Sequence, residues 1–135
     1  MESLALDTTF LIDLQNERRS RGHASGATDF LSEHQSVELL LPAVALGEYL
    51  EGFADSNAEA AQALIAPLRV LPVTAETALV YATVVRSLRT KGQLIGTNDL
   101  WIACTAKAAN LPLLTRNVSE FKRVPGLIVI GYAAL

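Results

Sequence analysis

The chain has 135 residues, half of them hydrophobic and few aromatic, which favours one helix-rich globular domain over residues 1–135 and excludes a disordered protein. Its net charge of −3 is divided unevenly, because residues 1–68 carry a balance of −8 and residues 69–135 a balance of +5. The single cysteine, Cys104, excludes an internal disulfide, fits a cytoplasmic location and is expected to be a small buried hydrophobe. No leader peptide and no membrane-spanning helix are expected, because the apolar runs are short and acids interrupt them.

The first half of the chain alternates short apolar strands with helices. A buried strand over residues 4–6 ends at Asp7, and a helix capped by Thr8 or Thr9 is expected to run to about residue 16. Asp13 is expected on the exposed face of this helix, and the polar residues that follow are expected in an exposed loop over 17–26. The later elements are a helix over residues 27–34, a strand over 37–41, helices over 42–53 and 58–65, and a strand over 68–73. Pro72 interrupts this last strand and argues for an edge position or an early end.

The second half continues the alternation. Thr74 is expected to cap a helix that ends at residue 89 or 91, with Leu79, Ala82, Val85 and Arg86 at helical spacing, and Gly92 fits the stop. A turn over residues 96–99 leads into a helix over 100–109, and strands are expected over 113–115 and 127–130. This order predicts a three-layer α/β/α domain with a mostly parallel sheet of four to five strands. His23 and His34 lie in polar segments without metal-ligand spacing and are expected at the surface.

Three acids stand where an apolar strand passes into a helix or inside the helix that follows: Asp7, Glu48 and Asp99. Carboxylates beside apolar segments are costly unless a cation or hydrogen bonds compensate them. Sites in parallel sheets form at the carboxyl ends of the strands, so the three acids could meet there and hold Mg²⁺ or Mn²⁺. A metal held in this way activates water against a phosphodiester. Taken singly, Asp7 and Asp99 could equally be helix caps, and Glu48 a solvated helix residue.

Four segments of the chain carry a resemblance to a known family. Residues 6–14 (LDTTFLIDL) are similar to the opening of a PIN domain, residues 46–52 (LGEYLEG) to its second acidic motif and residues 95–103 (IGTNDLWIA) to its third. Residues 115–121 (TRNVSEF), followed by 124–127, resemble the closing motif of VapC toxins from VapBC toxin–antitoxin modules. All four occur in order and cover nearly the whole chain.

The resemblance implies a PIN-like fold and a ribonuclease that depends on Mg²⁺ or Mn²⁺, is neutralised by a VapB-type antitoxin and forms a homodimer. It assigns catalysis and metal binding to Asp7, Glu48 and Asp99, and hydrogen-bonding support to Thr9 and Thr115. The position at which many relatives have a fourth acid is occupied here by Asn117, which leaves open whether one or two metals bind. Glu120 is the nearby acid that could compensate.

Three basic residues near the closing motif, Arg116, Lys122 and Arg123, could bind substrate phosphates, or could form a solvated surface cluster. Three other functions compete with the ribonuclease. A receiver-type phosphoacceptor domain would need an acid beside Asp7 and a late lysine, both of which are missing. A catalytically impaired binding module is suggested by Asn117, and a DNA nuclease with the same metal chemistry is a third alternative.

Overall fold

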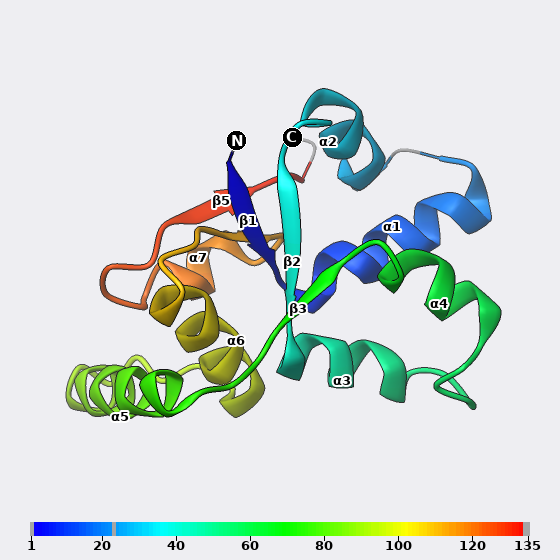
Figure 1. Ribbon diagram of the computed structural model, residues 1–135. Helices are drawn as coiled ribbons and strands as arrows, with labels where there is room; N and C mark the ends of the chain where they lie inside the picture. Colours follow the sequence, from blue (N-terminus) through cyan, green and yellow to red (C-terminus); the bar gives the residue numbers. More distant parts are fainter. Residues whose placement is uncertain (1, 23, 134–135) are drawn as a thin grey trace.

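The computed structural model describes residues 2–22 and 24–133, and within them five strands form one parallel sheet in the order β3-β2-β1-β4-β5 (Figure 1). Every neighbouring pair is parallel, which confirms the predicted sheet. The strands are β1 (Ser3–Leu6), β2 (Glu38–Pro42), β3 (Arg69–Leu71), β4 (Leu113–Thr115) and β5 (Val129–Gly131). β3 is an edge strand, as Pro72 predicts, because a proline cannot donate to a further strand.

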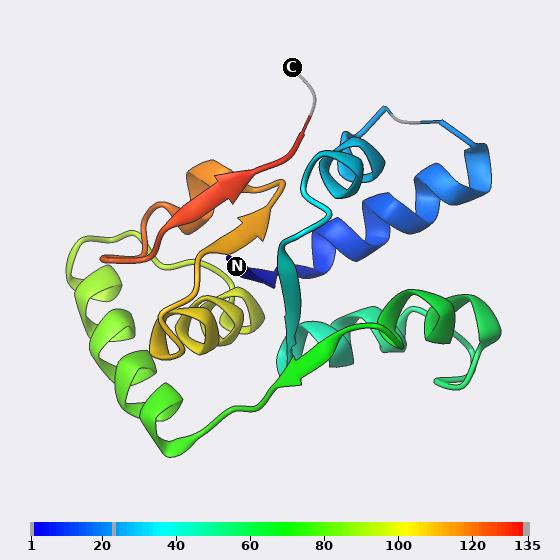
Figure 2. The same cartoon turned by 45° about the horizontal axis from the view of Figure 1, so that its top comes forward.

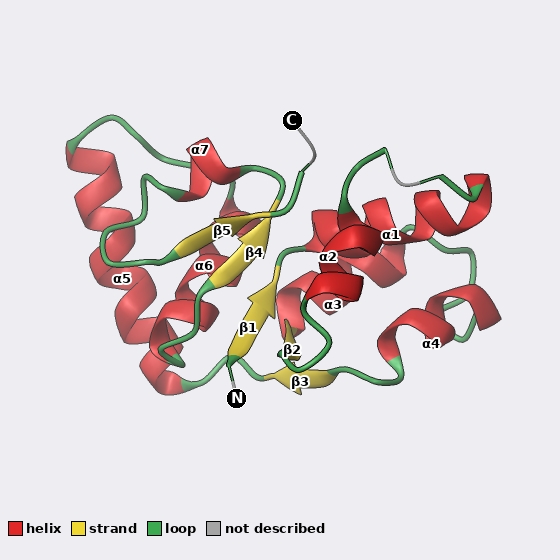
Figure 3. Cartoon of the chain, turned by 90° about the horizontal axis from the view of Figure 1, so that it is seen from above, coloured by secondary structure: helices red, strands yellow, loops and turns green. Residues whose placement is uncertain are grey.

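Helices cover both faces of this sheet, which confirms the three-layer α/β/α architecture. Figure 3 shows α5 and α6 on one side of the sheet and α1, α2 and α4 on the other. The helices are α1 (Thr8–Ser20), α2 (Ala27–Glu33), α3 (Ala43–Glu51), α4 (Glu59–Ile65), α5 (Ala75–Thr90), α6 (Thr97–Ala108) and α7 (Val118–Phe121). No helix in the described ranges is long and apolar enough to cross a membrane.

The central strand β1 fixes where the polar residues emerge. Its residues from Leu4 to Leu6 are buried, and it pairs with β2 on one side and β4 on the other. The register places Leu6 beside Leu114, and the backbone N–H of Asp7 donates to the Leu114 carbonyl at 3.0 Å. Asp7 and Thr115 therefore leave the sheet side by side, at the carboxyl ends of two neighbouring strands.

The first helix differs from its prediction in three ways. Asp7, and not a threonine, is the N-cap, because its side chain accepts from the backbone N–H of Thr8 at 2.8 Å. The helix also continues to Ser20, well beyond the predicted end, so the expected loop is partly helical. Asp13 is 5% exposed, and the prediction that it faces solvent is wrong because two distant side chains bind its carboxylate.

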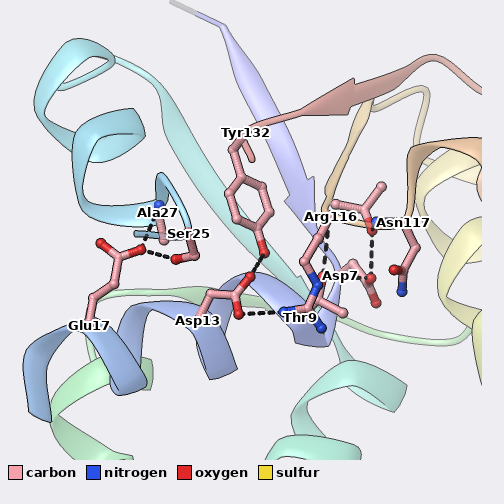
Figure 4. A network of polar contacts seen from close by, with 10 residues as sticks. Asp7, Thr9, Asp13, Glu17, Ser25, Ala27, Arg116, Asn117 and Tyr132 are labelled. Carbon is pink, nitrogen blue, oxygen red and sulfur yellow. Dashed lines mark hydrogen bonds and ion pairs between the residues drawn. The ribbon is translucent and has the colours of Figure 1, made fainter. Parts of the chain in front are cut away.

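Buried Glu17 explains why α1 extends so far. Its carboxylate accepts from the backbone N–H groups of Ala27 at 2.9 Å and Thr28 at 3.1 Å, and from the hydroxyl of Ser25 (Figure 4). Glu17 thereby satisfies the first N–H groups of α2, whose N-cap Gly26 offers no side chain for that purpose. The last turn of α1 and the start of α2 are thus stabilised by one residue.

Most of the remaining predictions are confirmed. Thr74 caps α5 through a reciprocal pair of hydrogen bonds with Thr77, and Cys104 is fully buried. Leu79 is 72% exposed, because α5 buries the face that carries Val84, Val85 and Leu88 and packs against α6. Helix α7 was not predicted; it packs against β5, which lies beside β4 in Figure 2. His34 is exposed as expected, while His23 lies outside the described residues.

Candidate active site

Asp7 lies at the centre of a set of hydrogen bonds between α1 and β4. Its Oδ2 atom accepts from the hydroxyl of Thr9 at 3.0 Å and from that of Thr115 at 2.7 Å. Only 2% of the residue is exposed. The two threonines assigned a supporting role thus both contact Asp7, and the acid is fixed from two separate elements (Figure 4).

Glu48 reaches the same end of the sheet from the middle of α3. Its Oε1 accepts from the hydroxyl of Thr8 at 2.7 Å, and its Oε2 accepts from the side-chain amide of Asn98 at 3.1 Å. Thr8 follows Asp7 on α1, and Asn98 precedes Asp99 on α6. Thr8 and Asn98, which are the sequence neighbours of Asp7 and Asp99, therefore bind the two carboxylate oxygens of Glu48. Neither residue was predicted to support Glu48, although their adjacency to Asp7 and Asp99 was a usable signal.

Asp99 lies in the first turn of α6 and is half-buried. Burial raises its pKa to about 7, and the negative charges of Asp7, Glu120 and Glu48 contribute to the same rise. The structure therefore brings Asp7, Glu48 and Asp99 into one electrostatic cluster, from β1, α3 and α6 respectively. The charges of three carboxylates thus oppose that of Asp99, an arrangement that is also found at sites that bind cations.

The pKa of Asp7 is also raised, chiefly because the residue is buried. The three hydrogen bonds that it accepts lower this pKa, and the charge of Glu48 raises it further. Two neighbouring acids whose charged forms are disfavoured gain from a cation that compensates both. Carboxylate oxygens are the ligands that Mg²⁺ and Mn²⁺ prefer, so the donor chemistry fits these metals. No three Asp, Glu, His or Cys side chains among residues 2–22 and 24–133 are already gathered in a metal-binding arrangement.

The fourth acid of the cluster is Glu120 and not the residue at position 117. Glu120 lies on α7 and forms a side-chain hydrogen bond with Asp99. Asn117 immediately precedes α7, and its backbone N–H donates to the hydroxyl of Thr115 at 3.0 Å. Asn117 and Glu120 are three residues apart, which is about one turn of a helix. This spacing would have indicated that Glu120 lies near position 117 only if α7 had been predicted.

The three basic residues near the site have different surroundings. The Nη1 atom of Arg116 forms an ion pair with Asp13 at 2.6 Å, while Lys122 and Arg123 are exposed on the surface. Arg123 donates to the backbone carbonyl of Leu94 at 3.4 Å. Only Arg116 is connected to the acids, because its backbone N–H donates to Thr9. Substrate binding by any of the three stays a prediction.

The chain was compared with known proteins. A family model described as PIN domain matches residues 4–127. "Ribonuclease VapC1" of Haemophilus influenzae (strain R2866) is 32% identical over 127 residues, which cover 90% of this chain and 92% of that protein. "Ribonuclease VapC1" of Methanocaldococcus jannaschii is 28% identical over 122 residues, or 90% and 80% of the two chains.

Solved structures agree with this match. The crystal structure of VapBC2 from Rickettsia felis bound to a DNA fragment from their promoter contains a chain that aligns with a TM-score of 0.83 at 26% identity, covering 96% of this chain and 98% of that one. A chain of VapBC-1 from nontypeable Haemophilus influenzae aligns over the same shares with a TM-score of 0.78 at 26% identity. The fold and the sequence match agree, and the chain belongs to the PIN domain family.

Proposed function

We propose that this protein is a VapC-type endoribonuclease that hydrolyses RNA phosphodiester bonds as the toxin of a toxin–antitoxin module. The observation that carries the proposal is the cluster of Asp7, Glu48 and Asp99 at the carboxyl end of β1, where their charges act on one another. Curated relatives that match nine-tenths of this chain bear the name ribonuclease VapC. Membership of the PIN family removes the receiver-type alternative. The influence of Glu120 on the pKa of Asp99 supports the proposal that Glu120 compensates for the acid missing at Asn117.

The proposed cofactor is Mg²⁺ or Mn²⁺, held by Asp7, Glu48 and Asp99, with Glu120 as a fourth carboxylate. When bound, such a cation supplies Lewis acidity towards the phosphate and lowers the pKa of water. Thr9 and Thr115 fix the orientation of Asp7, so that its carboxylate does not have to reorganise on binding. Thr8 and Asn98 fix Glu48 in the same way.

Cleavage of a structured RNA by the purified protein tests the proposal, with Mg²⁺, Mn²⁺ or a chelator in parallel reactions. We expect cleavage with either metal, none with chelator, and loss of cleavage in Asp7→Asn and Asp99→Asn. The matched control is Asp55→Asn, because Asp55 is an exposed acid. Its side chain accepts a hydrogen bond from the nearby backbone N–H of Asn57. Full cleavage by metal-saturated Asp99→Asn would contradict the assignment, and preferential cleavage of a matching single-stranded DNA would favour a DNA nuclease.

We further propose that residues 1–135 form a single cytoplasmic domain that dimerises and binds a VapB-type antitoxin. The matched structures of 26% identity are VapBC complexes, which supports such a partner. A cavity of about 360 Å³ between α1, β2 and α4 is lined by apolar side chains such as Leu14 and Leu64, together with Arg18 and Arg69. Glu38 also lines this cavity and pairs with Arg69 at 3.5 Å, so Arg18 is the cation that an apolar antitoxin segment with a carboxylate would meet.

A further inference from the structure

The cluster of Asp13, Arg116 and Tyr132 is a second polar site beside the acid cluster (Figure 4). Asp13 lies on α1 and is buried, yet both oxygens of its carboxylate have partners. Oδ1 accepts from Nη1 of Arg116 at 2.6 Å, and Oδ2 accepts from the hydroxyl of Tyr132 at 2.6 Å. A buried carboxylate is tolerated only when it is paired and hydrogen-bonded, so this geometry is strongly specified.

The hydroxyl of Tyr132 is held in place because the ring of this residue packs in the core. It is 8% exposed, and its ring meets that of Phe10 edge to face, with centroids 4.9 Å apart. Phe10 in turn packs edge to face against Phe30 of α2. Burial and the hydrogen bond to Asp13 raise the pKa of the Tyr132 phenol, so it remains a neutral donor. The packed ring of Tyr132 therefore keeps Asp13 in position even when the Arg116 side chain moves.

Arg116 is fixed at two points by one face of α1. Its backbone N–H donates to the hydroxyl of Thr9 at 3.3 Å, and its guanidinium is bound by Asp13. Thr9 and Asp13 are four residues apart and therefore lie on the same face of the helix. The same Thr9 hydroxyl donates to Asp7, so Arg116 is separated from the central acid by one threonine.

The guanidinium nevertheless remains available to a ligand. The Arg116 side chain is 47% exposed, whereas that of Asp13 is 6% exposed. A guanidinium has five N–H donors in a rigid fork, and Asp13 occupies one nitrogen of that fork. An arginine that is anchored on one side and open on the other loses little side-chain entropy when it binds an anion.

We propose that Asp13 and Tyr132 are positioning residues that hold Arg116 ready to bind a phosphate of the RNA beside the acid cluster. This inference rests on the proposed ribonuclease function for the identity of the ligand. Asp13 itself repels phosphate, so its role here is to orient the guanidinium and not to add attraction. The alternative is a purely structural lock between α1 and the loop after β4.

The test measures binding of a short fluorescein-labelled single-stranded RNA by anisotropy, in chelator, so that no cleavage occurs. Tyr132→Phe is the informative variant because it changes no charge and keeps the aromatic packing. Tyr49→Phe is its matched control, since Tyr49 is 3% exposed and donates its hydroxyl to Gln15 at 3.0 Å, away from Arg116. We expect Arg116→Ala to raise the Kd about tenfold and Tyr132→Phe about threefold. Tyr49→Phe should leave the Kd unchanged.

A double variant separates positioning from stability. In an Arg116→Ala background, Tyr132→Phe should cause no further loss of RNA affinity, because the group that it positions is gone. Arg116→Ala should also lower the salt dependence of binding by roughly one phosphate contact. Asp13→Asn should also lower RNA affinity, because the guanidinium loses the buried carboxylate that orients it.

Three results would overturn the inference: wild-type affinity in Tyr132→Phe, additive losses in the double variant, or tighter RNA binding by Asp13→Asn. The last would mean that Asp13 competes with phosphate for Arg116. Failure of the ribonuclease proposal has a different signature, namely RNA binding by the wild type without cleavage in either metal. In that case the affinity changes above would still decide the role of Arg116.

Discussion

Replacement of Asp99 by Asn should stabilise the metal-free protein above neutral pH. The pKa of Asp99 rises from an ordinary value of 3.8 to about 7 because the folded protein buries it beside other acids. The folded state therefore keeps a proton that the unfolded chain has already lost between about pH 4 and pH 7. The contribution of Asp99 to the free energy of unfolding falls as the pH rises through this window, and the loss is complete above the folded pKa.

The size of the effect follows from the two pKa values. A rise from 3.8 to about 7 corresponds to roughly 4 kcal/mol at 1.36 kcal/mol per pH unit. Asp99 is only half-buried, so screening by solvent reduces this to about 2 kcal/mol. For a chain of this length, a gain of this size raises the melting temperature by about 7 °C. Asn keeps the shape of the side chain and removes the charge.

The assay is thermal and urea unfolding in chelator at pH values from 5 to 8, with wild type and Asp99→Asn side by side. The difference between the two proteins should already be present at pH 5, should grow as the pH rises and should level off at about 2 kcal/mol by pH 8. Asp55→Asn, which changes an exposed acid, should track the wild type. Saturating Mn²⁺ at pH 8 should stabilise the wild type more than Asp99→Asn, by mass action on the folded state. Equal stability of wild type and Asp99→Asn across this pH range would refute the reasoning.

Three further perturbations address the residues around the site. Thr8→Val removes the hydroxyl that binds Glu48 at 2.7 Å, and initial rates of RNA cleavage should fall about tenfold with the fold intact; an unchanged rate would mean that Glu48 needs no orientation. Glu17→Gln leaves N–H groups of α2 poorly satisfied, and urea unfolding should register a loss of about 2 kcal/mol without a change in RNA affinity. Ala63→Glu places a charge in the cavity between α1, β2 and α4, so calorimetric titration should detect no antitoxin binding while RNA cleavage persists; normal binding would move the partner elsewhere.

The sequence was sufficient for those parts of the fold that local patterns encode. The strand before Asp7, the edge strand at Pro72 and the cap at Thr74 depend on neighbours in the chain, and the structure contains all three. The burial of Asp13 could not be predicted, because its partners Arg116 and Tyr132 lie more than a hundred residues further along the chain. A periodic pattern places any aspartate on the polar face unless such a partner is known.

The site divides in the same way. Motif order drew attention to Asp7, Glu48 and Asp99, and the structure brings their charges together. The contact between Glu120 and Asp99 depends on α7, a helix of four residues that is too short to leave a periodic signature. Which side chain stands near Asp99 is therefore decided by the packing of α7 on β5, and not by the position that a motif assigns to Asn117.

The buried acids of this protein fall into two kinds, and the difference lies in their neighbours. Asp13 and Glu17 are each 5% exposed, and every oxygen of both carboxylates accepts a hydrogen bond from the protein. Asp99 faces the carboxylates of Asp7, Glu48 and Glu120, so its negative charge is opposed. Folding alone gives no reason to gather four acids, because each gains more from solvent or from a donor. Burial alone does not separate the two kinds. Asp13 and Glu17 are bound by donors and hold the fold together, whereas the charge of Asp99 is opposed by other acids, which supports the proposed role in binding a cation.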